Sequence, residues 1–371
     1  MGAGLMKLDD IRSVYDGEGS YASVYLDVSR DNEDAEHQIG LRWRAVLAEL
    51  AQAGCDSKTL DCLEEFASDA DTGASQDRGL AAFARSGEVL LAAGLPAPPR
   101  RQIARFARLP HMMPLLAQEP PPLPQLLVRA ELAGGEIVSV DTDEDVSGEV
   151  RGSGWPVHRT SVGGWSQARY QRAVDQAWRQ NAEDLAEAVT SAAAKTGADV
   201  IILAGDVRAR SLLADQLPAA VQDRVVEVDA DVAADSDRLR TAAGDAGQRR
   251  RDQAARQALG DLRLGLSRDE AVQGFGPTVA ALRDSRVAQL LIDDHPSSAA
   301  MAWIGPDLAD LALSASELRE RGVAEPEQDR LDAALVRAVA GTGAELHLVP
   351  EGEDPPDEGL GATLRYANPA P

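Results

Sequence analysis

Residues 151–172 combine residue types that suit binding to a polyanion. The stretch holds four arginines and no Asp or Glu, so its formal charge is +4. Its four glycines permit close approach of the backbone to a partner, and its two tryptophans could stack on bases. The alternatives are a solvated loop leading into a helix capped by Ser166, or a tryptophan packed in the core. The candidate RNA-contacting residues are Arg151, Trp155, His158, Arg159, Gly163, Gly164, Trp165, Ser166, Arg169 and Arg172.

Two further basic islands stand out because the chain as a whole is acidic, with a formal net charge of −24. One spans residues 94–118 and contains four arginines and no acidic residue. The other lies on an expected helix, where Asp252 offsets part of its charge. Arginines on a helix are usually a solvated face, but three islands in an acidic chain favour a large polyanionic partner. The island arginines are Arg100, Arg101, Arg105, Arg108, Arg249, Arg250, Arg251 and Arg256.

Common catalytic and metal-binding patterns are missing from the sequence. It has no G-x-x-x-x-G-K-[ST] phosphate loop, no G-x-S-x-G nucleophile elbow and no H-E-x-x-H. The five histidines are scattered, and two cysteines cannot build a disulfide framework or a four-ligand zinc site. We therefore expect no metal and no cofactor. No apolar run is long enough for a membrane span and the N-terminus lacks a signal peptide's apolar core, so we expect a cytoplasmic protein without membrane contact.

The pattern of apolar residues predicts the elements that must position the arginines. Strands are expected at 21–29, 125–132, 136–141, 146–152, 199–205 and 224–229, with a hairpin turn at Gly134 and Gly135. Helices are expected at 34–53, from about 166 to 195, and from about 235 to 264. In the last third, residues 271–284 and 326–343 predict helices, and 287–294, 344–350 and 361–367 predict strands. Such alternation indicates an α/β protein.

The proline-rich segment 119–124 is the clearest boundary in the chain, because neither a helix nor a central strand can cross it. It separates an N-terminal α/β domain, residues 1–119, from a central domain, residues 124–264. A C-terminal domain, residues 267–371, completes the expected organisation of three small α/β domains. We find no internal repeat.

The run GGWSQARYQR, which begins at Gly163, resembles the Gly-Gly-Gln loop of the class-1 release factor and Pelota superfamily. It is more similar to the bacterial members of that superfamily, which are grouped as bacterial/archaeal release-factor-like proteins. The ANKZF-type peptidyl-tRNA hydrolases and the hibernation factor Balon belong to the same wider group. The runs AGDVRAR (204–210) and GATLRYA (361–367) also look family-like. The resemblance implies an RNase H-like central domain and an L7Ae-like C-terminal domain.

The resemblance also implies where the protein acts. It points to the ribosomal A site and peptidyl-transferase centre, with rRNA and tRNA as contacts and a translational GTPase of the EF-Tu type as a delivery partner. In the family, the loop glutamine helps to place a water on an ester carbonyl, a role that would fall to Gln167 here. Two residues, Trp165 and Ser166, separate the glycines from that glutamine, whereas in release factors Gln follows directly. The codon-reading motif Asn-Ile-Lys-Ser is absent.

Three functions remain open at this point. The first is a factor that occupies the A site without codon recognition, in ribosome hibernation or protection. The second is a peptidyl-tRNA hydrolase in which Gln167 positions the water. The third is a three-domain scaffold that does not bind ribosomes. The bulk of Trp165 favours the first over the second, because a large side chain at the loop tip suits stacking better than catalysis.

Overall fold

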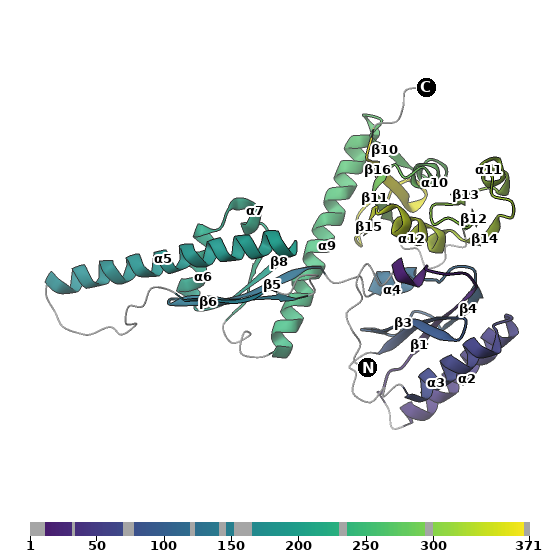
Figure 1. The fold of residues 1–371 in the computed structure, drawn as a ribbon, viewed down its shortest axis with the longest axis horizontal. Helices are drawn as coiled ribbons and strands as arrows, with labels where there is room; N and C mark the ends of the chain where they lie inside the picture. Colours follow the sequence, from purple (N-terminus) through teal and green to yellow (C-terminus); the bar gives the residue numbers. More distant parts are fainter. Residues whose placement is uncertain are drawn as a thin grey trace. The chain divides into compact units, whose positions relative to one another are not determined.

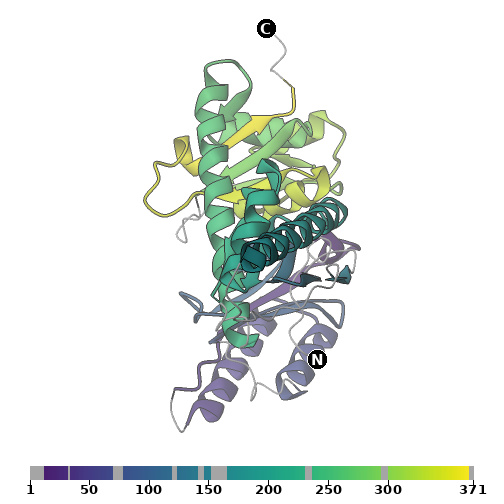
Figure 2. The same ribbon diagram turned by 90° about the vertical axis from the view of Figure 1, so that its left-hand side faces the viewer.

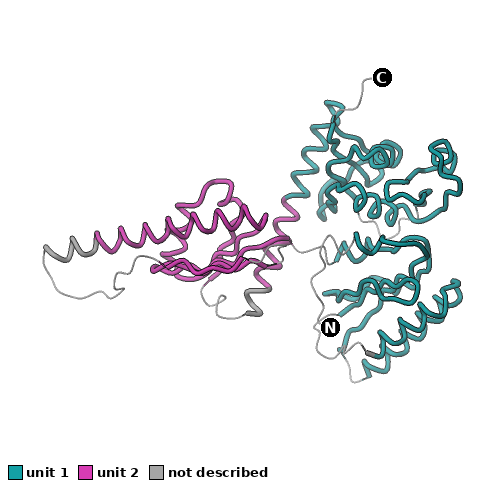
Figure 3. Tube along the Cα trace, viewed as in Figure 1, with its two compact units in different colours: residues 1–121, 254–371 teal, residues 122–253 magenta. Residues whose placement is uncertain are grey.

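A computed structural model describes residues 12–31, 34–69, 78–118, 123–140, 146–151, 165–229, 236–293 and 300–366 (Figure 1). For residues 69, 165–171 and 236–240 it describes the backbone alone. The chain divides into two compact units, coloured separately in Figure 3. Unit 1 comprises Met1–Pro121 and Ala254–Pro371, and unit 2 comprises Pro122–Gln253. Helices and strands alternate in both, which confirms the α/β class, whereas the boundaries of the three domains and their RNase H-like and L7Ae-like folds stay predictions.

The N-terminal segment of unit 1 is an antiparallel sheet with the strand order β3-β2-β1-β4. Successive side chains of β1 point to opposite faces of the sheet and both faces are buried, so the sheet carries two cores. Val24 and Leu26 share a core with Trp43 of α2, whereas Tyr25 and Phe83 point into the core of the C-terminal segment. The elements are β1 (Tyr21–Asp27), α2 (Ala35–Gln52), α3 (Ser57–Asp69), β2 (Gly79–Arg85), β3 (Glu88–Leu95), β4 (Ile103–Ala107) and α4 (Met113–Gln118).

The C-terminal segment of unit 1 contains two sheets, with the strand orders β10-β16-β11-β15 and β13-β12-β14. Its strands are β10 (Ala271–Gln273), β11 (Val287–Ile292), β12 (Met301–Ile304), β13 (Leu311–Ala312), β14 (Glu327–Arg330), β15 (Glu345–Leu348) and β16 (Leu360–Leu364). Its helices are α10 (Phe275–Arg283), α11 (Ala315–Glu320), α12 (Leu331–Thr342) and the 3₁₀ turn η1 (Asp357–Gly359). The helices predicted at 271–284 and 326–343 are wrong at their starts, because β10 and β14 occupy those residues and pair with strands distant in the sequence. Gly343 does end α12 in a left-handed conformation, as its sequence predicts.

Two carboxylates, one buried and one partly buried, join the two segments of unit 1. Asp329, at 1% exposure, accepts a hydrogen bond of 2.9 Å from the Leu109 amide and forms an ion pair with Arg105. Asp332 accepts from His111, whose Nε2 lies 3.3 Å from the Asp332 Oδ2. The residues 105–111 belong to the N-terminal segment and both carboxylates to the C-terminal one. The two segments therefore share polar contacts as well as a hydrophobic core.

Unit 2 is a five-stranded sheet with the order β7-β6-β5-β8-β9, in which β5, β8 and β9 are parallel. Two helices, α5 and α6, cover one face, and Ala246 of α9 packs on the other with Val200 and Ile202 of β8. Figures 1 and 2 show α5 and the sheet from two directions. The elements are β5 (Gln125–Glu131), β6 (Gly134–Val140), β7 (Ser147–Arg151), α5 (Trp165–Thr196), β8 (Val200–Gly205), α6 (Val207–Gln216), α7 (Ala219–Gln222), β9 (Val225–Glu227) and α9 (Ser236–Leu266), which continues into unit 1.

The hairpin between β5 and β6 turns two residues earlier than predicted. The turn lies at residues 132–133, and β6 itself begins at Gly134. Gly135 has another role, since a Cβ there would lie 2.6 Å from the Arg129 carbonyl oxygen and 2.7 Å from the Leu185 Cδ2. The glycine is needed for the close packing of α5 on the sheet.

Candidate functional site

The predicted contact residues lie at the end of β7, in the segment after it and at the start of α5. Arg151 is the last residue of β7, and α5 begins at Trp165. Ser166 is therefore inside the helix and is not its N-cap, and Gln167 occupies the first turn instead of a loop tip. Trp155, His158, Arg159, Gly163 and Gly164 lie outside the described residues. Arg151 and Arg172 are the two predicted site residues whose side chains are described, and both are exposed.

The charge of Arg151 is compensated locally. Its Nη2 lies 2.9 Å from the Glu149 Oε2, and both side chains are largely exposed. The hydrogen bond from Arg151 lowers the pKa of Glu149 below its usual value. Because Glu149 stands two residues outside the acid-free stretch, the basic character at this end of the site is smaller than the sequence count predicts.

The arginines of α5 are concentrated in its first half. They lie beyond the first turn, to which the effect of the helix dipole is confined, and the last turn carries Lys195, which the dipole favours. In α5 the first sixteen positions contain three arginines and one acid, and the first turn has no acid. The last sixteen contain three acids and one lysine. The residues are Arg169, Arg172, Asp175 and Arg179 in the first half, and Glu183, Asp184, Glu187 and Lys195 in the second.

The basic half of α5 makes little use of the protein core. Among residues 172–180 no side chain is buried, whereas burial begins at Asn181 and continues through Leu185 and Val189. The Asn181 Nδ2 donates a hydrogen bond of 2.9 Å to the Leu132 carbonyl oxygen, which fixes the helix to the β5–β6 turn. The C-terminal half therefore holds α5 in place and leaves the basic half accessible to a partner.

The turn from β8 into α6 places a further arginine, Arg208, beside this half. Gly205 ends β8 with a φ of +108°, and a Cβ there would lie 2.2 Å from the Ala130 carbonyl oxygen, so only glycine fits. Asp206 then caps α6 by accepting from the amides of Arg208 and Ala209. The Arg208 guanidinium stacks on the Trp178 ring, with its Cζ 4.4 Å from the ring centroid. Sequence reasoning noted AGDVRAR but missed this contact, because residues 30 apart meet only through α5–α6 packing.

The other two basic islands are partly used for internal contacts. Arg105 pairs with the buried Asp329, and the Arg108 Nε lies 3.0 Å from the Glu327 Oε1. The Arg256 Nε lies 3.0 Å from the Glu353 Oε1. These arginines are therefore weaker candidates for a polyanion contact than the count of charges indicates.

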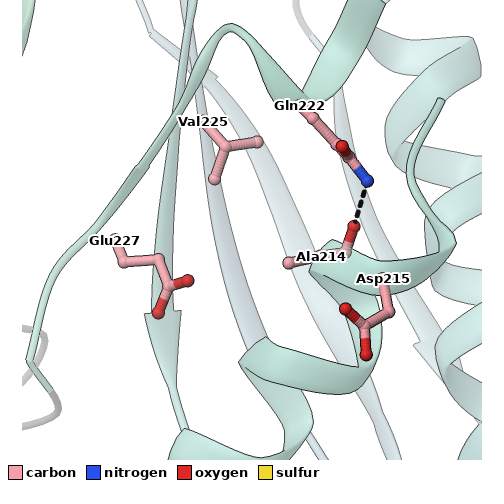
Figure 4. A pocket seen from close by; sticks show the side chains of 5 residues that line it. All are labelled: Ala214, Asp215, Gln222, Val225 and Glu227. Carbon is pink, nitrogen blue, oxygen red and sulfur yellow. Dashed lines mark hydrogen bonds between the residues drawn. The ribbon is translucent and has the colours of Figure 1, made fainter. Parts of the chain in front are cut away.

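An open pocket of about 290 Å³ lies elsewhere in unit 2 (Figure 4). It is lined by Ala214, Asp215, Gln222, Val225 and Glu227, none of which belongs to the predicted site. The Gln222 Nε2 donates a hydrogen bond of 2.7 Å to the Ala214 carbonyl oxygen across it. Its two carboxylates repel phosphate, so we do not assign it to a nucleic acid.

The described part of the chain shows neither a metal-binding cluster nor a membrane-spanning helix. Within those residues, no group of three or more His, Cys, Asp or Glu side chains could hold a metal ion. None of the helices described is both long and apolar enough to cross a membrane.

Comparisons with known proteins show which sequences and structures this chain is similar to. A protein of Mycobacterium tuberculosis (strain ATCC 25618 / H37Rv), Uncharacterized protein Rv2629, is 28% identical over 370 residues, which cover 98% of this chain and 97% of that protein. Pelota of Archaeoglobus fulgidus is 12% identical, covering 98% of this chain and 94% of that one, with a TM-score of 0.37. A model of ribosome-bound archaeal Pelota and ABCE1 is 13% identical, covering 98% and 96%, with a TM-score of 0.36.

Residues 124–268 match the model of a family described as bacterial archaeo-eukaryotic release factor family 2. The match contains the whole of α5 and the β8–α6 turn, the two elements that carry the candidate site. The resemblance to release factors is thus confirmed, and it is carried by residues 124–268, which match the model of that family.

Proposed function

We propose that this protein is a ribosome-binding translation factor that occupies the A site without codon recognition and serves in ribosome hibernation or protection. The observation that carries the proposal is the concentration of arginines in the first half of α5, inside a release-factor-like segment. Exposed arginines such as Arg172 and Arg179 attract phosphate groups, and rRNA presents them densely. The absence of an Asn-Ile-Lys-Ser motif supports binding that does not depend on a stop codon.

The proposal assigns roles to the predicted residues. Arg169 and Arg172 contact rRNA phosphates near the peptidyl-transferase centre, and Trp165 stacks on a nucleotide there. Arrival at the A site together with a translational GTPase of the EF-Tu type, and contact with tRNA, belong to the same proposal.

A second function is favoured by the position of Gln167 in the first turn of α5. The protein would then be a peptidyl-tRNA hydrolase without a cofactor. Water attacks the ester carbonyl, the bond to the tRNA ribose oxygen breaks, and that oxygen takes the proton that the water loses and becomes a hydroxyl. Gln167 orients the water, as a positioned amide can.

Co-sedimentation with vacant ribosomes and with ribosomes carrying peptidyl-tRNA tests both functions. Binding to vacant ribosomes without peptide release supports occlusion. Release that the Gln167→Ala variant loses while it still binds supports hydrolysis. The matched control is Lys195→Gln, which removes one positive charge from the other end of α5. Failure of the wild-type chain to bind either kind of ribosome would overturn both functions.

A further inference from the structure

Arg208 of α6 is held in a fixed orientation yet stays accessible to solvent. Its guanidinium lies over the Trp178 ring at 4.4 Å, and its Nη2 lies 2.8 Å from the Asp175 Oδ1. Its side chain nevertheless remains 51% exposed. A guanidinium that a ring and a carboxylate already orient loses less rotamer entropy when its remaining donors bind a phosphate.

The contacts of Arg208 with Asp175 and Trp178 contribute too little to folding stability to explain why this arginine is held there. The Asp175 side chain is 46% exposed, and an ion pair this exposed contributes little to stability. An exposed cation–π contact is similarly weak. Val207, which precedes the arginine, is 69% exposed, so the start of α6 presents apolar surface to solvent as well.

Asp175 also lies between two arginines of α5. Arg172 precedes it by three residues and Arg179 follows it by four, so all three project from one flank of the helix. Arg172 and Arg179 are both exposed and are separated by about 10 Å along the helix axis. Arg208 reaches the same flank from α6, because it pairs with Asp175. Three arginines thus gather around one carboxylate in a chain whose net charge is −24.

We propose that Arg172, Arg179 and Arg208 form one phosphate-binding surface, here called the α5–α6 arginine surface, which extends the contact with rRNA from the start of α5 onto α6. Trp178 and Asp175 orient Arg208, and the phosphates of a structured RNA are the ligands. This inference rests on the proposed function, since it names a second part of the same RNA interface. It adds Arg179, Arg208 and Trp178, which the pattern of the sequence did not identify.

Salt-dependent binding of the full-length chain to vacant ribosomes tests the surface. Each phosphate contact contributes about 0.7 to 0.9 to the slope of log affinity against log salt. We expect Arg208→Gln and Arg179→Gln each to weaken binding by about tenfold. Each variant should also reduce the magnitude of that slope by the contribution of about one phosphate contact. Titrations at fixed magnesium from about 50 to about 200 mM KCl cover the range in which the slope is measurable.

Two further variants separate an RNA contact from a structural clamp. Lys195→Gln removes the same charge at the far end of α5 and should leave the slope unchanged. Trp178→Leu keeps every charge but removes the stacking platform, so affinity should fall while the slope changes by less than in Arg208→Gln. Urea denaturation of each variant shows that it is folded.

The outcomes distinguish this inference from the proposed function. If the wild-type chain binds ribosomes and Arg208→Gln and Arg179→Gln retain its affinity and slope, the α5–α6 arginine surface is refuted while ribosome binding stands. A loss of stability in Arg208→Gln with an unchanged slope would make it a clamp between helices and would also overturn the inference. If the wild-type chain does not bind, both ideas fail together.

Discussion

Replacing Asp329 by alanine tests whether buried carboxylates hold the two segments of unit 1 together. Asp329 accepts from the Leu109 amide, pairs with Arg105 and accepts from the adjacent Arg330 amide at 2.6 Å. The Leu109 residue is 3% exposed, and the Arg105 side chain 21%. The substitution would leave one buried amide and one mostly buried guanidinium without their acceptor.

The size of the effect follows from these burials. Removing one member of a buried ion pair costs about 3–5 kcal/mol, and an unsatisfied buried amide costs about 1–3 kcal/mol. These costs overlap, and Arg105 keeps a hydrogen bond of 2.9 Å to the Leu109 carbonyl oxygen and some contact with water. We therefore expect Asp329→Ala to lower the free energy of unfolding of unit 1 by about 3 kcal/mol. Asp329→Asn keeps an acceptor for the amide and should cost about half as much.

Hydrogen exchange as a function of urea is the appropriate assay, because it reports on unit 1 separately from unit 2. Peptides from β1 and α12 should lose protection together, since the two elements share one core. The matched control is Asp31→Ala, which breaks the exposed ion pair with Arg78 and should cost less than about 1 kcal/mol. Equal losses in Asp329→Ala and Asp31→Ala, or loss of protection in only one of the two elements, would refute the reasoning.

Three further outcomes follow from local geometry. Gly205→Ala should destabilise unit 2 by about 2–4 kcal/mol, because Gly205 has a φ of +108° and an alanine Cβ there would clash with Ala130. Urea denaturation measures this cost, and a value under about 0.5 kcal/mol would contradict the prediction. Burial opposes ionisation of Asp332, but hydrogen bonds from His111 and Arg330 outweigh it and hold the Asp332 pKa well below its usual range. The stability advantage of the wild-type chain over Asp332→Asn should therefore be full above about pH 4 and shrink as the pH falls, whereas melting temperatures that differ equally at every pH would disprove it. Burial raises the pKa of Cys55 to about 11, which leaves little reactive thiolate at pH 8. Iodoacetamide at pH 8 should therefore label Cys55 on the order of 100-fold more slowly than free cysteine, as measured by mass spectrometry. Equal labelling rates would show that the thiol is accessible.

Long elements with a clear period were predictable from the sequence. The strand predicted at 199–205 is β8, whose residues Ile202 and Leu203 belong to different cores. The helix expected from about residue 166 begins one residue earlier in the structure, and the helix from about residue 235 begins one residue later. These elements follow from side-chain periodicity alone, which a single sequence contains.

Short strands were not predictable, because pairing with distant residues creates them. The three residues of β10 pair with β16, ninety residues later, and β14 pairs with β12 through residues such as Asp329 and Ala302. Both strands directly precede a helix, so local periodicity assigns their residues to it. The hairpin turn was misplaced for a related reason, since Gly135 serves a close contact with α5 and not the turn.

The candidate site is also only partly predictable from the sequence. The basic start of α5 is visible in the sequence, because one run of residues builds it. The contact between Trp178 and Arg208 depends on how α5 and α6 pack, and the neutralisation of Arg105 depends on a carboxylate 224 residues away. Composition could therefore identify a basic stretch but could not say which arginines the fold uses internally.

The distribution of charge and burial along α5 links the fold to the proposed function. The second half of the helix is buried through residues such as Leu185 and Val189, and this packing stabilises the helix. Residues 172–180 contain no buried side chain, so the packing does not depend on Arg172 and Arg179. An anionic partner would therefore gain affinity from these arginines without any change in the core that holds the helix.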